Sequence, residues 1–237
     1  PLRSAWAGPP FRTDDPDPVA YRHWEVYFAS TGAYNAMLGL LSTLPHVEVN
    51  YGAAPGLQLH VIVPMAIAHA PGEATQYGYG DTEIGAKLRF LEEGKRRPEV
   101  GVFPLVEVPS GDAARGLGAG FTQIFIPVWV QKSWGGKPDA PAWTSYGGAG
   151  WWRNPGPGNQ NWTFAGWELQ RNLSDKIMLG GEIFSATAAV AGAAGGTGYN
   201  LGGAVNFSDH RHLLYSLGQD AQPRHPLIWY AAYQWTF

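Results

Sequence analysis

The sequence has no cysteine, few charged residues and no long apolar run. The absence of cysteine among 237 residues fits an oxidising compartment, where stray thiols are a liability. Only 15% of the residues are charged, against about 25% in ordinary soluble domains. No run approaches the roughly 18 apolar residues that a spanning helix needs. The net charge is −3 and there is no basic patch, which argues against nucleic acid as a partner.

Glycine and aromatic residues are abundant instead, with 32 Gly, 11 Trp and 11 Tyr. The apolar residues are spread along the chain at every second position rather than gathered in runs. A chain that is poor in charge, rich in aromatic residues and alternating in this way is typical of a transmembrane β-barrel.

The last nine residues form the most informative alternating segment. Four aromatic residues and Ala231 fall on one face, and Thr236, Gln234 and Ala232 fall on the other. As an edge strand in water, this segment would be sticky and its backbone unpaired. A final strand of a soluble sandwich is the alternative, but we expect this face to meet lipid and the strand to close a barrel. The expected membrane girdle and insertion signal are Trp229, Tyr233, Trp235 and Phe237.

Clusters of turn-forming residues separate about twelve alternating segments. The connections between them are alternately mostly short and mostly longer, like the periplasmic turns and outer loops of outer-membrane barrels. We therefore predict a closed, antiparallel, up-and-down transmembrane β-barrel with both chain ends on the periplasmic side. The predicted strands cover residues 22–31, 44–52, 57–67, 80–91, 98–108, 120–132, 142–153, 161–171, 176–187, 198–208, 212–218 and 227–237.

Some local features of this barrel are predicted separately. Residues 32–43 are expected to form a longer outer loop, in which 33–41 is either a short helical stretch or an extension of the strand, and residues 133–140 a short turn. Because proline removes a donor from the ladder, we expect bulges or bends at Pro64, Pro104 and Pro127.

The predicted inward face is mainly polar. One interpretation is a lumen that conducts or binds a solute, and the other is a network of side chains that props up a narrow barrel. Carboxylates outnumber Lys and Arg on this face, which disfavours a strongly anion-selective pore. Tyr27, Phe103, Phe125 and Phe184 add ring surfaces. The residues predicted to line the solute pathway are Glu48, His60, Glu83, Lys87, Arg89, Glu107, Gln123, Trp129, Glu168 and Glu182.

The start of the sequence divides into two parts ahead of the barrel at residues 19–237. Residues 1–7 resemble a signal-peptide remnant, because Ala5-Trp6-Ala7 has the small-x-small form of a cleavage site. Residues 8–18 are predicted to form an arm that is ordered against the barrel. We expect its acidic groups to pair with Lys87, Arg89 or the basic turn at 95–97, and Phe11 to supply packing.

We expect no catalytic site, metal or cofactor. No Gly-x-Ser-x-Gly nucleophile elbow occurs. The acidic cluster at 14–17 lacks the glycine turn and distal Glu of a calcium loop, so a solvated lead-in is favoured over a cation site. His210 and His212 form a polar turn with no evident third ligand.

Six segments spread over nearly the whole chain resemble a known family. They are residues 8–16, 22–27, 46–52, 79–85, 103–111 and 232–237. The family consists of bacterial outer-membrane proteins assigned to transport in the meta-pathway of phenol degradation. The resemblance implies a single outer-membrane barrel with a transport role.

The function predicted from the sequence is passive transport of small, hydrophobic or aromatic solutes across the bacterial outer membrane. The expected partners are membrane lipid, the barrel-insertion machinery and a small-molecule solute. Two alternatives stay open: a structural barrel that serves as sleeve or scaffold for another protein, and an outer-membrane enzyme. A continuous water path would favour transport, and a lumen blocked by polar networks would favour the structural barrel.

Overall fold

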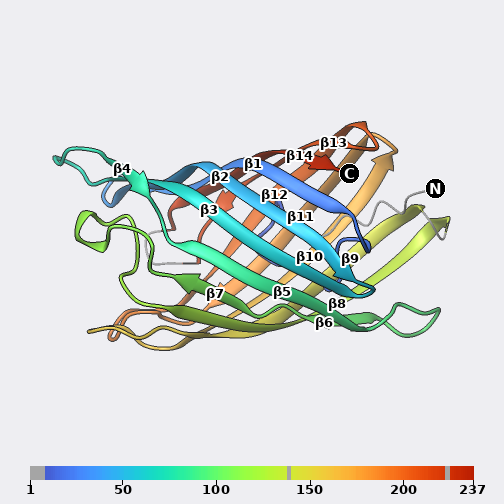
Figure 1. Ribbon diagram of the computed structural model, residues 1–237, viewed down its shortest axis with the longest axis horizontal. Coiled ribbons are helices and arrows are strands. Elements are labelled where there is room, and N and C mark those ends of the chain that lie inside the picture. The colour runs from blue at the N-terminus through green and yellow to red at the C-terminus, as the bar shows by residue number, and fades with distance from the viewer. Residues whose placement is uncertain (1–8, 138–139, 222–224) are drawn as a thin grey trace.

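The computed structural model describes residues 9–137, 140–221 and 225–237, most of which lie in one sheet that closes on itself (Figure 1). Within these residues no helix is long and apolar enough to cross a membrane. The elements in chain order are β1 (Trp24–Asn35), β2 (Gly39–Ala54), β3 (Leu57–His69), β4 (Gln76–Tyr79), β5 (Thr82–Leu91), β6 (Glu99–Val102), β7 (Leu105–Val108), the short 3₁₀ helix η1 (Ala113–Arg115), β8 (Gln123–Lys137), β9 (Ala140–Arg153), β10 (Trp162–Ser174), β11 (Ile177–Ala186), β12 (Gly196–Ser208), β13 (Arg211–Gln219) and β14 (Leu227–Thr236).

The sheet is a closed antiparallel barrel of twelve strands. β4 and β5 are successive parts of one barrel strand, since both pair with β3. β6 and β7 are likewise two parts of one strand, between β5 and β8. β14 pairs with β1 and completes the circle, which confirms the predicted fold class.

The two ends of the barrel differ. At one end, where β1 begins and β14 finishes, two-residue turns join β2 to β3, β10 to β11 and β12 to β13. We call this the terminal end. Longer segments at 109–122, 154–161 and 187–195 connect the strands at the other, the loop end. The predicted alternation of short and longer connections is therefore confirmed for most of the barrel (Figure 1).

Two predicted connections are wrong. The loop expected at 32–43 is a tight hairpin in which β1 continues to Asn35 and β2 resumes at Gly39, and no helical stretch is present there. Asn35 accepts a hydrogen bond from the backbone of Met37, and Gly39 has a φ of 93°, so three residues are enough for the turn. At the terminal end, β8 continues to Lys137 and β9 begins at Ala140, where we predicted a turn over 133–140.

The three prolines differ in their effect on the strands. Pro104 separates β6 from β7, and the strand beside Pro64 is interrupted between β4 and β5, so breaks near both residues are confirmed. The bend predicted at Pro127 is wrong, because the β8–β9 ladder continues through it without a shift in register. On its other side, β8 pairs with β7 up to Phe125 and with β6 from Val128. Pro127 thus lies where the ladder is already interrupted, and its missing N–H leaves no bond unmade.

Apolar side chains cover the outside of the barrel, and polar ones lie inside. Ile183 and Leu201 are each 66% exposed on the outer face, whereas Glu168 is fully buried on the inner face. This distribution is the reverse of that in a soluble protein, and it suits a wall between lipid and an inner polar space.

The closing strand is placed as predicted. Tyr233 and Trp235 of β14 lie opposite Phe28 and Val26 of β1. Beyond the strand, Trp24 and Phe237 exchange two backbone hydrogen bonds of 2.7 and 3.0 Å. The side chains of Trp235 and Phe237 are exposed on the outside. The aromatic face therefore belongs to the outer surface of the barrel.

Candidate functional site

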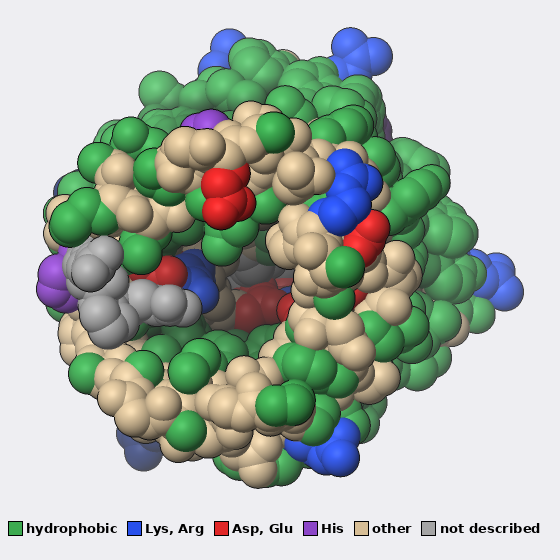
Figure 2. All heavy atoms as spheres, turned by 90° about the vertical axis from the view of Figure 1, so that its left-hand side faces the viewer, with side chains coloured by type: hydrophobic (Ala, Val, Ile, Leu, Met, Phe, Trp, Pro, Cys, Tyr) green, Lys and Arg blue, Asp and Glu red, His purple; other side chains and the backbone are tan. Residues whose placement is uncertain are grey.

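All ten residues of the predicted solute pathway project from strand positions that face the interior. Six are buried: Glu48, His60, Lys87, Trp129, Glu168 and Glu182. The other four, Glu83, Arg89, Glu107 and Gln123, are partly buried. Figure 2 shows the loop end hollowed at its centre, with acidic and basic side chains in the depth of the hollow. Their part in solute transport stays a prediction.

One polar cluster on the inner wall is centred on His60. Its ring nitrogens lie 2.6 Å from Asn50 Oδ1 and 2.9 Å from Glu83 Oε1. Asn50 donates in turn to Glu48 at 2.8 Å. The imidazole meets the edge of the Phe103 ring, with the ring centres 5.2 Å apart. The cluster joins the inward side chains of β2, β3 and β5, which are neighbours in the barrel and pair through their backbones at this level.

Residues 9–20 precede β1 and lie inside the barrel. We call them the arm. Thr13 and Asp15 have no exposed surface, and Phe11 is also buried. The arm forms no strand. Val19 donates its backbone N–H to Gln58 near the terminal end, and the Pro10 carbonyl accepts from Ser216 of β13 further along the lumen.

Ion pairs fix the acidic stretch of the arm. The ammonium of Lys87 lies 3.0 Å from Asp14 and 3.4 Å from Asp15. Arg89 pairs with Asp17. The predicted pairing with Lys87 and Arg89, and the packing of Phe11, are confirmed. The alternative, a solvated lead-in, is wrong.

The arm bridges the lumen from wall to wall. The backbone N–H groups of Arg12 and Thr13 both donate to the carboxylate of Glu182 on β11, at 2.8 and 2.7 Å. The next residue, Asp14, binds Lys87 on β5. In the order of pairing, β11 is five steps from β5 around the twelve-stranded barrel. Consecutive residues of the arm therefore hold nearly opposite walls, and the arm fills this level of the lumen, which we call the waist.

Four glycines on different strands make room for the arm. A Cβ on Gly166 would lie 2.1 Å from Thr13 Oγ1, and one on Gly52 would lie 2.0 Å from the Ala20 carbonyl oxygen. On Gly101 and Gly180 it would lie 3.1 Å from Pro16 and from Phe11, respectively. While Thr13 Oγ1 and the Ala20 carbonyl keep these positions, a side chain at Gly166 or Gly52 would displace the arm or the wall. The inner wall is therefore shaped to hold the arm in one place.

Aromatic rings cover the inner wall between the waist and the loop end. They come from neighbouring strands β8 to β11 and form a nearly continuous series. Ring centres are 5.3 Å apart for Trp162 and Trp152, 4.7 Å for Trp152 and Phe125, and 5.8 Å for Phe164 and Phe184. Trp129 links Phe125 to Phe164, with ring centres 6.4 Å from each. We call these six residues the aromatic wall.

The aromatic wall was predicted only in part. Phe125, Trp129 and Phe184 were assigned to the interior, but Phe164, Trp152 and Trp162 were not. Alternation through Trp162, Phe164 and the inward Glu168 was a signal that could have identified two of them. Trp151 and Trp152 are adjacent, so the sequence does not say which one faces inward. The structure places Trp151 outside, 41% exposed, and Trp152 inside.

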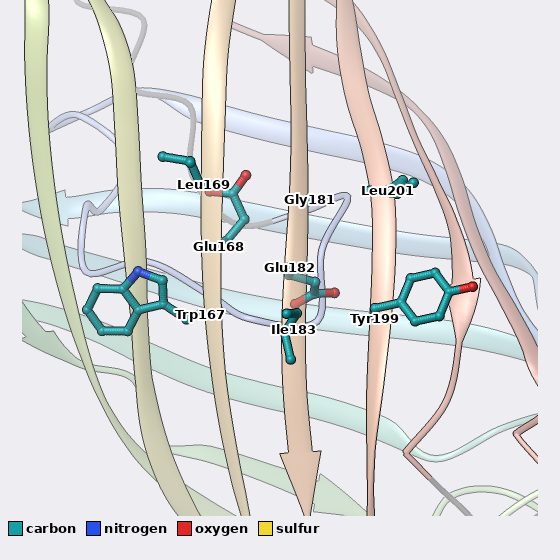
Figure 3. Close-up of a pocket in the computed structure, with 8 residues that line it drawn as sticks. All are labelled: Trp167, Glu168, Leu169, Gly181, Glu182, Ile183, Tyr199 and Leu201. Carbon is teal, nitrogen blue, oxygen red and sulfur yellow. The ribbon is translucent and has the colours of Figure 1, made fainter.

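A shallow groove lies on the outer face of β10, β11 and β12 (Figure 3). Its volume is about 520 Å³, and Gly181 lies between the exposed side chains of Leu169 and Leu201. Glu168 and Glu182 belong to the same strands, but they are buried on the lumen side. The groove faces the lipid and is separate from the interior that the arm and the aromatic wall occupy.

His210 and His212 do not form a site together. His210 lies in an exposed turn and contacts the Thr236 carbonyl oxygen at 2.8 Å, while His212 is buried inside the barrel. In the part of the chain that the structure describes, no three His, Cys, Asp or Glu side chains gather as metal ligands would. The turn interpretation of this motif is the one that the structure supports.

Comparisons with known proteins give information about the fold. No protein-family model matches the chain, and no curated protein matches it in sequence. Among solved structures, it is similar to an outer membrane channel from Pseudomonas putida F1, with 17% identity, a TM-score of 0.68, and coverage of 93% of this chain and 97% of that one. It also aligns with the translocator domain of autotransporter NalP from Neisseria meningitidis, with 11% identity, a TM-score of 0.49, and coverage of 91% and 88%.

The fold and the surface together define the class of protein. A closed barrel whose outer face is apolar satisfies its backbone internally and presents a lipid-compatible surface. The shared fold with a solved outer membrane channel agrees with this arrangement. The chain is therefore a transmembrane β-barrel, with lipid as the neighbour of its outer face.

Proposed function

We propose that this protein is a passive outer-membrane channel for small aromatic solutes, with no enzymatic activity. The observation that carries the proposal is the aromatic wall, which runs from the hollow at the loop end towards the waist. Trp152 and Trp162 are only partly buried, so some of their ring surface is left uncovered. Uncovered ring surface binds aromatic rings by offset or edge-to-face stacking, which contributes about 0.5–1.5 kcal/mol beyond burial for each pair.

The polar residues of the interior complement the rings. Carboxylates outnumber ammonium and guanidinium groups among the ten pathway residues. An acidic lumen attracts cations and repels anions, so neutral or weakly cationic solutes are favoured. A phenolic or related solute would stack on the rings and hydrogen-bond to the polar groups beside them. This class of solute also agrees with the family resemblance drawn from the sequence.

Adjacent tryptophans of β9 provide a matched test. Trp152→Ala removes a ring from the aromatic wall, whereas Trp151→Ala removes a ring from the outer face. With the purified protein in liposomes, we expect uptake of phenol to fall in Trp152→Ala, and further in Trp152→Ala/Trp162→Ala, by about two- to tenfold for each lost stacking contact. Trp151→Ala should retain wild-type uptake. Equal uptake by the wild type and the double variant would refute the aromatic specificity.

One observation favours a second candidate function. The arm fills the waist, and a permanently filled lumen suits a structural barrel that acts as a sleeve or scaffold. Such a barrel would show neither ion conductance nor solute uptake in lipid bilayers, with or without its arm. We favour the channel because Trp152 and Trp162 are only partly buried and leave ring surface uncovered inside the barrel.

We also infer that β14 carries a recognition signal for the barrel-insertion machinery. The support for this is its position at the closing seam and its outward aromatic residues, ending with Phe237. The exposed rings of Trp235 and Phe237 contribute little to the folded barrel, so a role during assembly accounts for them better.

A further inference from the structure

We propose that the arm is a displaceable plug that closes the channel at the waist. The proposal rests on the proposed function, because a passive channel needs a path past the arm. Transport through the interior is obstructed where Thr13 and Asp14 hold β11 and β5 at once. The arm therefore has to leave the waist, at least in part, when a solute passes.

The way in which the arm is attached allows it to move. Within residues 9–20, four of the twelve are prolines, which have no backbone N–H to add to a ladder. In each described hydrogen bond between residues 10–19 and the wall, at least one of the two partners is a side chain. Displacing the arm would leave every barrel strand paired with its two neighbours.

The inner wall behind the arm is suited to water. The arm covers Lys87, Glu182 and Gln58, whose polar groups would be hydrated in an open lumen. Breaking a buried ion pair is costly when the remaining charge stays dry, and much less so when water replaces the partner. Opening the waist therefore replaces polar contacts between arm and wall with hydrogen bonds to water.

With the arm in place, the buried carboxylate of Glu168 lacks hydrogen bonds. This side chain is fully buried, and neither carboxylate oxygen has a hydrogen-bond partner among the described residues. Its Oε1 and the Phe11 ring both lie over Gly180, at 2.3 and 3.1 Å from the position a Cβ would take. A buried polar group without a partner is unfavourable. Withdrawal of Phe11 would admit water to Glu168 and offset part of the cost of opening.

The contact of the arm with Gly166 allows a direct test. A Cβ at position 166 would lie 3.2 Å from the Cβ of Thr13, close to the distance that a disulfide spans. The chain has no native cysteine, so Thr13→Cys/Gly166→Cys introduces the only possible bridge. A Cβ at position 101 would lie 3.1 Å from the Cβ of Pro16, so Pro16→Cys/Gly101→Cys gives a second disulfide at another depth of the lumen. We call each disulfide-bridged double variant a lock.

The measurement is ion conductance and phenol uptake by each lock in lipid bilayers, first oxidised and then after addition of reductant. We expect loss of both activities in the oxidised form and their recovery on reduction. The single variants Thr13→Cys, Pro16→Cys and Gly101→Cys, treated in the same way, control for the substitutions and the reagents. A variant lacking residues 9–19 should conduct more than the wild type.

The outcomes separate the plug from the proposed function. If a folded, oxidised lock conducts as well as its reduced form, the arm does not need to move and the plug proposal is overturned. The proposal is also overturned if the variant without the arm conducts no more than the wild type. If that variant conducts ions but takes up no aromatic solute, the plug is supported and the proposed solute class is refuted.

Discussion

At the scale of the residue, Glu182 holds two consecutive residues of the arm. Its two carboxylate oxygens accept from the backbone of Arg12 and Thr13, and Asn200 donates to Oε1 at 2.6 Å. Hydrogen bonds to a charged acceptor contribute about 1.5–3 kcal/mol each. A neutral amide at this position presents N–H groups to one of the two backbone donors and loses that bond.

We therefore expect Glu182→Gln to release the arm more often. Arg12 precedes Thr13, so trypsin can cleave between them when the arm is outside the lumen. Cleavage at this bond should be about tenfold faster in Glu182→Gln than in the wild type, measured by mass spectrometry of the folded protein in detergent. Glu107→Gln changes an inner carboxylate that has no described contact with the arm, and it should be cleaved at the wild-type rate. Equal rates in all three proteins would contradict this role of Glu182.

How far single residues were predictable depended on the clarity of the alternation. Charged residues such as Glu83 and Lys87 alternate along the strand with apolar residues. Because successive strand residues point to opposite faces, this alternation predicted that the charged side chains point inward. The arm's pairing with Lys87 and Arg89 followed from charge. Its wall-to-wall path could not be predicted, because the glycines that admit it, such as Gly166, show their purpose only when strands far apart in sequence surround the arm.

At the scale of the element, the number and order of strands were predicted, and several strand ends were not. Hydrophobic alternation identifies the part of each strand that lies between lipid and lumen. It does not identify a strand that continues through residues without this alternation, as β8 does over 133–137. The β1–β2 hairpin was mistaken for a loop because its turn at 36–38 contains Ala, Met and Leu rather than the usual turn residues.

Position along a strand determines the cost of an outward charge. Val61 pairs with Val49 and Ile84, between the exposed Leu59 and Val63, in the outward row of β3. Phe237 lies beyond the end of β14. Arg at the bilayer midplane costs about 2–4 kcal/mol, and near the interface about 0–1 kcal/mol.

Val61→Arg should accordingly lower the free energy of unfolding by about 2–4 kcal/mol, and Phe237→Arg by no more than about 1 kcal/mol, in denaturant titrations in lipid vesicles. The order should reverse for yield of folded protein in outer membranes of cells, where Phe237→Arg removes the proposed recognition signal. Phe237→Tyr, which retains an aromatic ring, is the control. Wild-type yield of Phe237→Arg would contradict the assembly role.

At the scale of the whole molecule, the arm changes the charge of the interior as well as its width. Asp14, Asp15 and Asp17 are brought into the lumen by the arm, and they neutralise Lys87 and Arg89. Without the arm, these two cations are added to the open pathway. The inner carboxylates of the wall remain, so the lumen keeps an excess of acidic groups but a smaller one.

We therefore expect a cation preference in the wild type that decreases in the variant lacking residues 9–19. The measurement is the reversal potential across a bilayer under a gradient of KCl, at low salt, because screening weakens the effect as ionic strength rises. Glu107→Gln should also reduce the preference, since Glu107 faces Glu83 across the β5–β7 ladder on the inner wall. Glu73→Gln, in an exposed loop connecting β3 to β4, should leave the reversal potential unchanged. Anion preference in the wild type would show that Lys87 and Arg89, rather than the carboxylates, control which ions enter.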